Sequence, residues 1–309
     1  MRKVFVAGGR GLVGRAVVNQ LRREGYHVFA PSSAVLDLRD YPQVDNFIRE
    51  FRPDAIVLAA ARVGGIVANE TWPVDFLMEN LQIQTSVFRA AHANGVDRLL
   101  FMGSSCIYPK HAEQPMSPEA LLSGPLEPTN RAYAVAKLAG VEACHAYWSQ
   151  FDRNYFALLP SNVYGLGDNY REGESHVVPS MIRKFVAAKQ SHAKQVCLLG
   201  GPDTQRELLH ASDLAHAVSA LLFRHVPAED NLPINIPGRE IYMWKLADTI
   251  ADLVGFSGPI HFTGTHVGTP RKALTPSREL VELGWTPEVS LASGLAGCLE
   301  DYLNNDVRK

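Results

Sequence analysis

Two side chains at helical spacing could together move a proton onto or off a carbonyl oxygen. Tyr133 and Lys137 stand at positions i and i+4, so a helix places the phenol and the ammonium one turn apart on one face. Tyrosine has an ordinary pKa of about 10, and a nearby cation such as Lys137 is expected to lower that pKa toward the working pH. Ser104 ends a predicted strand and could offer a second hydroxyl to the same oxygen. Because a Tyr–Lys pair at this spacing also occurs by chance on surface helices, its interpretation depends on the neighbouring elements.

A glycine-rich segment near the start of the sequence fits the turn that binds a dinucleotide. Residues 8–14 read Gly-Gly-Arg-Gly-Leu-Val-Gly and lie between an apolar strand, Val4–Ala7, and a helical pattern that ends at Gly25. Glycine permits a tight turn, a close approach of the backbone to a pyrophosphate, and close packing of the helix on the strand. The helix N-terminus then supplies unpaired N–H donors. This setting favours a cofactor site over a purely conformational role. The predicted contacts are Gly8, Arg10, Gly11, Leu12, Val13 and Gly14.

The end of the second predicted strand indicates which dinucleotide binds. NAD-specific sites usually place Asp or Glu there to bind the ribose hydroxyls. This sequence has Ala30-Pro31-Ser32-Ser33 instead, and Arg10 in the glycine turn could face a 2′-phosphate. Both observations favour NADP(H) as the cofactor, and its oxidised nicotinamide would add a second positive charge beside Tyr133. The alternative is that Arg10 is a solvated loop residue.

The order of elements predicts an α/β protein with a Rossmann-type doubly wound parallel sheet and a smaller C-terminal α/β substrate-binding region. Short apolar runs alternate with helical patterns in the first half, as in right-handed βαβ units. We expect an NADP(H)-binding domain at residues 1–164 and mainly a substrate-binding region at 165–309, with some of the later chain able to return to the first domain. Besides Val4–Ala7, the predicted strands are His27–Ala30, Ala55–Ala60, Leu99–Met102 and Phe156–Leu159.

A polar insert separates the last two predicted strands. Residues 109–128 are rich in Pro, Ser and Glu, which indicates a loop that flanks the active site rather than a core element. In the C-terminal region, residues 177–188 and 212–223 have helical patterns, and Ser212 and Asp213 are candidate caps for the second of these helices.

Bulk composition excludes several classes of protein. The 309 residues carry a net charge of −2, so no overall positive field favours nucleic acid or an anionic membrane surface. No apolar run reaches the roughly 18 residues that a membrane helix needs. The four cysteines are scattered without a C-x-x-C pair, which argues against a zinc site and a disulfide scaffold. We therefore expect a cytoplasmic protein that binds neither metal, nucleic acid nor membrane.

These residues together resemble the extended short-chain dehydrogenase/reductase family. The resemblance rests on the glycine turn, on Tyr133 and Lys137, and on segments at the predicted strand ends, including Ala59-Ala60-Ala61. It implies hydride transfer at a carbonyl, with Tyr133 as the acid, Lys137 holding Tyr133 and the nicotinamide ribose, and Ser104 polarising the carbonyl. Besides Tyr133 and Lys137, the further cofactor contacts that it implies are Ser33, Asp37, Leu38, Ala59, Ala60, Ala61, Pro160, Asn162, Val163 and His176.

Longer segments are similar to the members of this family that epimerise and reduce a GDP-linked 4-keto-6-deoxy sugar. They span residues 60–69, 103–110, 127–130, 175–179 and 268–272. Inverting the carbons beside a ketone requires a base that removes an acidic proton and an acid that returns one on the opposite face. The resemblance makes Cys106 the base and His176 the acid, while Ser104 and Tyr133 would hold the enolate oxygen. It implies a GDP-sugar substrate, whose diphosphate needs convergent cations. The implied substrate contacts are Asn162, Lys184, Arg206 and Lys272.

Two departures from that pattern leave alternatives open. Leu199 stands where the family often has an aromatic residue that could stack on guanine, and Ser33 replaces a basic residue at the end of the second strand. One alternative is a related enzyme for another GDP-4-keto sugar, of the 6-deoxy-heptose or colitose type. A more distant one is a regulator that senses NADP(H) without turnover, although such proteins typically lose the Tyr or the Lys. The family also implies a homodimer formed through the helices around residues 80–93 and 132–149.

Overall fold

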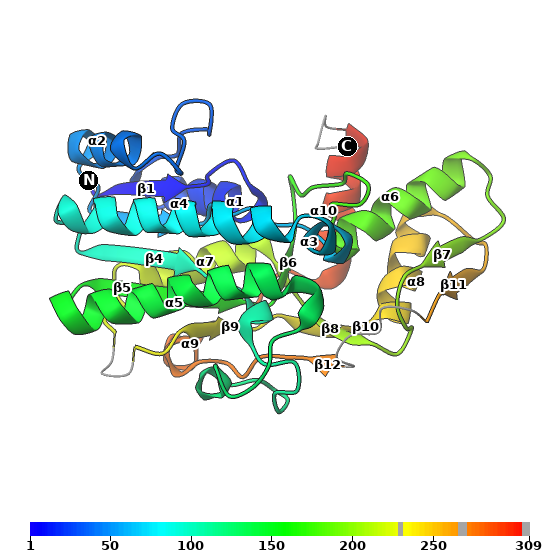
Figure 1. Cartoon of the computed structure of the whole chain (residues 1–309). Coiled ribbons are helices and arrows are strands. Elements are labelled where there is room, and N and C mark those ends of the chain that lie inside the picture. Colours follow the sequence, from blue (N-terminus) through cyan, green and yellow to red (C-terminus); the bar gives the residue numbers. More distant parts are fainter. Residues whose placement is uncertain (228–230, 265–270, 305–309) are drawn as a thin grey trace.

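A six-stranded parallel sheet forms the centre of the larger region (Figure 1). The computed structural model describes residues 1–227, 231–264 and 271–304. The strand order is β2-β1-β3-β4-β5-β9, and each neighbouring pair is parallel. The strands are β1 (Lys3–Ala7), β2 (His27–Phe29), β3 (Ala55–Leu58), β4 (Arg98–Met102), β5 (Asn154–Pro160) and β9 (Ile234–Ile236). The predicted Rossmann-type sheet is thereby confirmed, with its order reversing between β1 and β3, where such sheets bind nucleotides.

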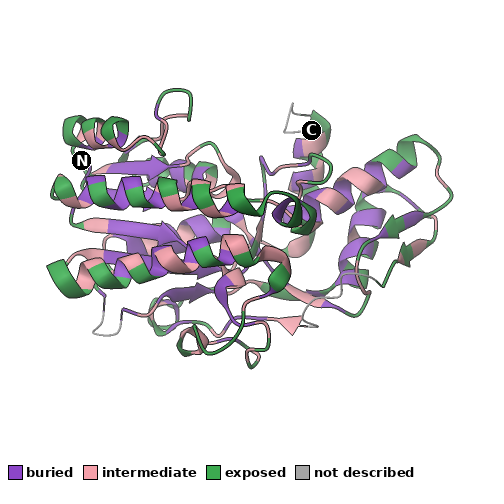
Figure 2. Cartoon of the chain, viewed as in Figure 1, coloured by how far each residue is buried: buried purple, intermediate pink, exposed green. Residues whose placement is uncertain are grey.

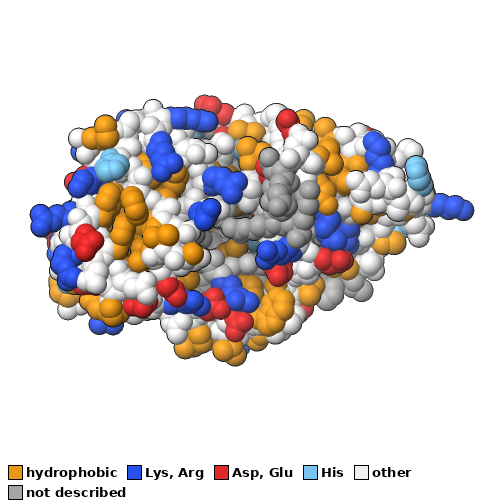
Figure 3. All heavy atoms as spheres, turned by 90° about the horizontal axis from the view of Figure 1, so that it is seen from above, with side chains coloured by type: hydrophobic (Ala, Val, Ile, Leu, Met, Phe, Trp, Pro, Cys, Tyr) orange, Lys and Arg blue, Asp and Glu red, His pale blue; other side chains and the backbone are white. Residues whose placement is uncertain are grey.

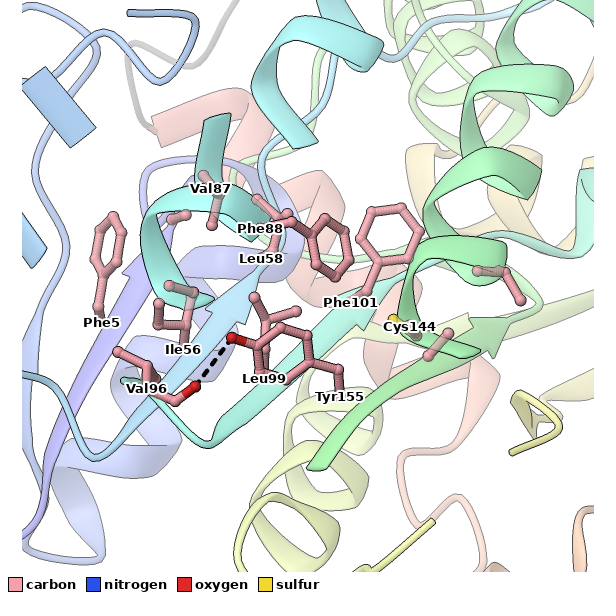
Figure 4. Close-up of a cluster of buried hydrophobic side chains, with 14 of the residues drawn as sticks. Phe5, Ile56, Leu58, Val87, Phe88, Val96, Leu99, Phe101, Cys144 and Tyr155 are labelled. Carbon is pink, nitrogen blue, oxygen red and sulfur yellow. Dashed lines mark hydrogen bonds between the residues drawn. The ribbon is translucent and has the colours of Figure 1, made fainter. Parts of the chain in front are cut away.

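Helices cover both faces of this sheet (Figure 1). On one face lie α2 (Tyr41–Phe51), α4 (Pro73–Ala93) and α5 (Arg131–Phe151). On the other face α1 (Leu12–Arg23) packs against α7 (Ala211–Leu222). Strands β1, β3, β4 and β5 are buried on both sides, which explains their apolar runs, whereas the edge strand β2 exposes His27 and Phe29 (Figure 2). Figure 4 shows aromatic side chains of the first layer, among them Phe88 of α4 packed against Phe101 of β4.

The chain after residue 165 contributes to both regions. Strand β9 and helix α7 complete the sheet of the larger region, because α7 packs on α1 and β9 pairs with β5. The smaller region, on the right of Figure 1, has its own apolar core. Its helices are α6 (Val177–Gln190), α8 (Met243–Val254) and α10 (Leu291–Asn304). Its strands are β6 (Asn162–Tyr164), β7 (Val196–Leu198), β8 (Gln205–His210), β10 (Arg239–Tyr242), β11 (Ile260–Phe262) and β12 (Arg271–Lys272).

Short elements connect these parts. The α-helices α3 (Ile66–Thr71) and α9 (Arg278–Glu282) and the 3₁₀ turns η1 (Ser105–Ile107), η2 (Pro118–Ala120) and η3 (Pro128–Asn130) lie in the connections. Residues 109–128 form the loop that the composition predicts, although Met116 within it is buried. In the described part of the chain, no helix combines the length and the apolar character needed to span a membrane.

The predicted caps of α7 are wrong. The cap is His210, whose ring nitrogen accepts a hydrogen bond from the Ser212 backbone at 3.3 Å. The Asp213 carboxylate instead accepts hydrogen bonds from the backbone N–H groups of Glu288 and Val289. A carboxylate near a helix start can satisfy any nearby backbone donors, and here a distant segment of the chain supplies them.

Candidate active site

The glycine turn has the tight geometry that a pyrophosphate requires. Gly8 has a φ of +88°, and a Cβ there would lie 2.5 Å from the backbone nitrogen of Ala60. A Cβ at Gly14 would lie 2.1 Å from the carbonyl oxygen of Gly8, so helix α1 can approach the turn only with glycine at this position. Gly11 is the N-cap of α1 and offers no side-chain acceptor, which leaves the first helical N–H groups available to a ligand. The turn therefore fits a dinucleotide.

The other cofactor candidates differ in how far they are exposed. Arg10 and Ser33 are exposed, as a contact to a 2′-phosphate would require. Asp37 binds Arg39 through a 2.8 Å ion pair, and hydrogen bonds from Arg39 lower the pKa of Asp37 to about 2. The candidates that are half-buried are Leu12, Val13, Leu38, Ala59, Ala60, Ala61 and Val163. Pro160 is buried at the end of β5, and Asn162 is exposed just beyond it.

Tyr133 and Lys137 lie on α5, against the end of strand β4. The Lys137 ammonium donates a hydrogen bond to the carbonyl oxygen of Met102 at 2.6 Å and lies 5.9 Å from the centre of the Tyr133 ring. It also lies 4.8 Å from the centre of the Phe101 ring. A Cβ at Gly140 would lie 2.2 Å from Phe101, so this glycine lets α5 pack closely on β4. The predicted helical pair is thus fixed on the sheet rather than on the surface.

Ser104 joins this pair from the carboxyl end of β4. Its side chain hydrogen-bonds with that of Tyr133, an interaction that lowers the pKa of the phenol. Burial has the larger effect and raises the pKa of Tyr133 above its ordinary value. The prediction that Lys137 lowers this pKa is therefore wrong for the protein's own groups. The reason is that burial of the phenol disfavours its charged form, and burial also lowers the pKa of Lys137, to about 8.

Cys106 lies within reach of these groups. Its backbone N–H donates to the Ser104 hydroxyl at 3.3 Å in the turn η1. Burial raises the pKa of the Cys106 thiol, whereas a hydrogen bond with Ser104 and the positive charges of Lys272 and Lys137 lower it. Desolvation therefore disfavours ionisation of the Cys106 thiol, and the two nearby cations and the Ser104 hydroxyl partly offset that effect.

His176 is the N-cap residue of helix α6 in the smaller region. The backbone N–H of Gly65 donates to the carbonyl oxygen of Glu174 at 2.9 Å, and a Cβ at Gly65 would lie 2.6 Å from that of Ser175. The glycine therefore lets the segment before His176 lie directly against the segment that follows β3. The residue has an exposed surface, yet its imidazole is desolvated by surrounding protein, which lowers its pKa.

Arg206 and Lys272 form a second group of charges beside Cys106. They are cross-strand partners on β8 and β12, so their side chains lie on the same face of that sheet. Desolvation lowers the pKa of both, and the negative charge of Glu127 opposes that effect at each. Glu127 is buried and forms a 3.4 Å ion pair with Lys110. Three cations around one carboxylate leave a net positive charge of two, which matches the two negative charges of a diphosphate diester.

The remaining substrate candidates are less closely grouped. The Lys184 ammonium donates to the carbonyl oxygen of Cys197 at 3.2 Å, which ties it to strand β7. The Asn162 amide donates to the carbonyl oxygen of Glu207 at 3.0 Å on strand β8. Leu199 is 58% exposed, so it leaves an apolar surface where a stacking ring was expected. The segment Gly268-Thr269-Pro270 lies outside the described residues.

Three residues of this neighbourhood were not predicted from the sequence. Lys110 and Glu127 belong to segments that carry the resemblance, yet nothing in their spacing marks them as an ion pair. Asn235 is fully buried between two isoleucines in β9. A single polar residue inside an apolar strand was the available signal, because burying an amide is costly unless its hydrogen bonds are made. Among the described residues, no cluster of His, Cys, Asp and Glu could hold a metal ion.

The sheet order, the glycine turn and the Ser–Tyr–Lys group define a Rossmann-fold oxidoreductase of the short-chain type, as the sequence predicts. The chain belongs to the NAD dependent epimerase/dehydratase family, whose model matches residues 4–236. It is 45% identical to GDP-L-fucose synthase 1 of Arabidopsis thaliana, covering 98% of this chain and 94% of that one. It is 42% identical to GDP-L-fucose synthase of Escherichia coli, covering 99% and 98%.

A solved structure extends this similarity. It is MlghC, a GDP-mannoheptose C4 reductase from Campylobacter jejuni with NADP bound. This structure has a TM-score of 0.87 and 28% sequence identity, over 98% of this chain and 98% of that one. Relatives and structure thus align with the chain over nearly its whole length, so both regions of the fold are shared.

Proposed function

We propose that the chain is an NADPH-dependent 3,5-epimerase and 4-reductase that converts GDP-4-keto-6-deoxy-D-mannose to GDP-L-fucose. The observation that carries this proposal is the position of Cys106 beside Ser104, Tyr133 and Lys137. A reductase alone needs only the last three, whereas a thiol next to the carbonyl-polarising pair can remove the acidic proton adjacent to a ketone. Full-length similarity to GDP-L-fucose synthases supports the choice of substrate.

The epimerisation half uses groups on both sides of the sugar. Cys106, as a thiolate favoured by the charges of Lys272 and Lys137, removes the proton. The Ser104 and Tyr133 hydroxyls stabilise the enolate oxygen by hydrogen bonds in a desolvated site. His176 returns a proton on the opposite face. The same hydroxyls then serve the reduction, since the raised pKa of Tyr133 keeps the phenol protonated and able to donate to the new alkoxide.

NADPH would be held at the glycine turn and supplies the hydride for the carbonyl carbon when bound. The half-buried alanines 59–61 border the turn. Arg10 and Ser33 are exposed and would bind the 2′-phosphate. Lys137 would hold the ribose and Tyr133 in place from α5. At the other end of the substrate, Arg206 and Lys272 bind the diphosphate, with Asn162 and Lys184 as further contacts.

The decisive experiment incubates the protein with NADPH and GDP-4-keto-6-deoxymannose in deuterated water. We expect loss of the reduced-nicotinamide absorbance together with deuterium at C3 and C5 of the product. Cys106→Ser should lose the deuterium exchange by about 100-fold or more while retaining C4 reduction. Cys197→Ser, at an exposed cysteine on β7, is the matched control and should change neither. Full exchange in Cys106→Ser would reject the assignment of the base.

The same assay separates the alternatives. Oxidation of NADPH with a GDP-4-keto-6-deoxy-heptose or a colitose precursor, and none with the deoxymannose compound, would select a related reductase. Absence of oxidation with every keto sugar, despite NADPH binding, would leave the sensing regulator. The similarity to a GDP-mannoheptose C4 reductase is what keeps the first alternative in the test.

We further propose a cytoplasmic homodimer. The outward faces of α4 and α5 lie side by side and carry apolar side chains, with Val74 69%, Met78 46% and Val135 40% exposed. Pairing two such faces would bury them in a four-helix contact. Light scattering should give twice the chain mass, and Met78→Glu should shift the protein to monomer.

All four cysteines are unpaired, which suits a reducing compartment, and cell fractionation tests that placement. Side chains of both charges lie on the face shown in Figure 3.

A further inference from the structure

One buried amide joins the segment of the candidate base to the segment of a candidate phosphate ligand. Asn235 lies in β9, the last strand of the six-stranded sheet, and is 0% exposed. Its Oδ1 accepts a hydrogen bond from the Tyr108 hydroxyl at 2.6 Å. Its Nδ2 donates to the carbonyl oxygens of Met116 at 3.0 Å and Thr275 at 3.2 Å. The carbonyl and both N–H donors of the amide are thus bonded inside the protein.

On one side, the amide fixes the turn that carries Cys106. The turn η1 is flanked by its N-cap Ser104, whose hydroxyl accepts from the Cys106 backbone, and by its C-cap Tyr108, whose N–H donates to the carbonyl oxygen of Ser105 at 3.4 Å. The Tyr108 side chain is 2% exposed, so its hydroxyl has no solvent to bond with. The bond to Asn235 therefore anchors the C-terminal end of the turn, two residues from the thiol.

On the other side, the amide fixes the segment that follows Lys272. The backbone N–H of Met116 donates to the carbonyl oxygen of Ala273 at 2.8 Å, and that of Thr275 donates to the carbonyl oxygen of Met116 at 2.9 Å. Nδ2 of Asn235 donates to the carbonyl oxygens of Met116 and Thr275, the two residues joined by the second of these bonds. The backbone of Asn235 also donates to the Ser277 hydroxyl at 2.8 Å. Strand β12, with Lys272, is thereby held at a fixed distance from β9.

We propose that Asn235 is a positioning residue that sets the place of Cys106 through Tyr108 and the place of Lys272 through Met116 and Thr275. This inference rests on the proposed function, because it assigns the two segments their roles as base and phosphate ligand. An isoleucine would match the neighbours of Asn235 in the strand and avoid burying an amide. A fully bonded buried amide instead fixes the geometry of every segment that it joins.

The first test breaks the bond to the Cys106 turn alone. Tyr108→Phe removes one hydroxyl and leaves the ring in place. The matched control is Tyr155→Phe: Tyr155 is also fully buried, and its hydroxyl donates to the carbonyl oxygen of Val96 at 2.9 Å at the opposite end of the strands (Figure 4). Both variants lose one buried hydrogen bond, so they should lose similar stability.

The measurement is the rate at which iodoacetamide alkylates Cys106, followed by peptide mass spectrometry across pH. Exposed Cys197 in the same molecule is the internal reference. In Tyr108→Phe we expect Cys106 to react roughly three- to tenfold faster relative to Cys197, because the loosened turn exposes the thiol. Deuterium exchange at C3 and C5 should slow by a similar factor. Tyr155→Phe should leave both quantities unchanged.

The second test breaks the other side. In Asn235→Asp the carboxylate still accepts from Tyr108 but cannot donate to Met116 and Thr275. We expect the Kd for GDP, measured by calorimetry, to rise by roughly three- to tenfold. The reactivity of Cys106 should stay near that of the unmodified protein. If Tyr108→Phe does not fold, this variant still tests whether Asn235 positions the segment of Lys272.

Several outcomes would overturn the inference. They are an unchanged Cys106 reactivity in Tyr108→Phe, an equal change in Tyr155→Phe, and an unchanged affinity for GDP in Asn235→Asp. Alkylation requires no turnover, so this part of the test does not depend on the substrate. If the unmodified protein oxidised NADPH with no keto sugar, the proposed function would fail while the positioning role of Asn235 would still be measured.

Discussion

The larger and smaller regions hold their candidate functional residues by different means. In the larger region, Ser104 lies two residues after β4, a strand that is bonded to a neighbour on each side, and Lys137 lies within a 21-residue helix. In the smaller region, Lys272 lies in β12, a strand of two residues at the edge of its sheet. Regular backbone hydrogen bonding of strands and helices thus positions the candidate reductase residues.

Polar side chains from other segments take over that task for the residues that follow Lys272. The segment after Lys272 is bonded by Asn235, by Glu207, whose carboxylate accepts from the Leu274 backbone at 3.2 Å, and by Gln114, whose amide oxygen accepts from the Ala273 backbone at 2.9 Å. Single substitutions should therefore act differently in the two regions. In the larger region they should change the reaction rate or the packing of helices on the sheet. In the smaller region they should change the positions of candidate ligands and the pH dependence of stability.

The largest effect on chemistry is expected from Tyr133→Phe. The ring keeps its edge-on contact with Phe76, with centroids 6.3 Å apart, while the proton donor is lost. C4 reduction should fall by about 100- to 10,000-fold, the usual contribution of a general acid. The rate of NADPH oxidation measures this fall. Tyr242→Phe, at an exposed tyrosine of the smaller region, should keep full activity. A similar fall in both variants would contradict the assignment.

Packing in the larger region is tested by Gly14→Ala. The added Cβ would lie 2.1 Å from a backbone oxygen, so helix α1 must move away from the turn. We expect a loss of about 3 kcal/mol in the free energy of unfolding, measured in urea, and weaker NADPH binding. The control is Gly297→Ala in α10 of the smaller region, where the nearest atom is a Leu166 side-chain carbon at 3.8 Å. This control should gain up to about 1 kcal/mol, because alanine favours the helix. Equal losses of unfolding free energy in Gly14→Ala and Gly297→Ala would contradict the close packing of α1 on the turn.

The same contrast explains what the sequence could predict. The strands of the larger region and the glycine turn follow from local patterns, since apolar runs and glycine spacing report directly on buried strands and tight turns. The pair Tyr133 and Lys137 follows from helical spacing. The raised pKa of Tyr133 did not follow, because it depends on burial by elements distant in the sequence.

The substrate side was less predictable for a physical reason. Glu127 and Lys110 meet only after a loop closes, and Asn235 reaches segments more than 100 positions earlier in the chain. Such long-range contacts produce no periodic pattern in the sequence. The wrong caps of α7 have the same origin, since residues 288 and 289 take the carboxylate that would have capped the helix.

The smallest predicted effect concerns Glu207, a buried carboxyl in the smaller region. Burial raises its pKa from 4.5 to about 7, the first of several influences that include the charges of Glu240 and Arg271. Because the folded state favours the protonated form, its contribution to stability is full below pH 4.5 and is lost as the pH rises through about 7. Glu207→Gln is neutral at every pH. The variant should therefore gain stability relative to the unmodified protein between these values, by about 3 kcal/mol at most.

Urea unfolding at pH 5 and pH 8 measures this difference. The lost bond to the Leu274 backbone adds an offset to the variant, so the change with pH is the informative quantity. Glu240→Gln is the matched control, because Glu240 lies opposite Glu207 on β10 and its bond with Arg271 lowers its pKa. Its contribution is fully present above the ordinary pKa of 4.5 and is lost only as the pH falls below that value, so the control should stay nearly parallel to the unmodified protein between pH 5 and pH 8. If the unfolding free energies of both variants changed with pH as that of the unmodified protein does, the buried charge of Glu207 would not affect the stability of the smaller region. The position of strand β12 would then depend on backbone hydrogen bonds alone.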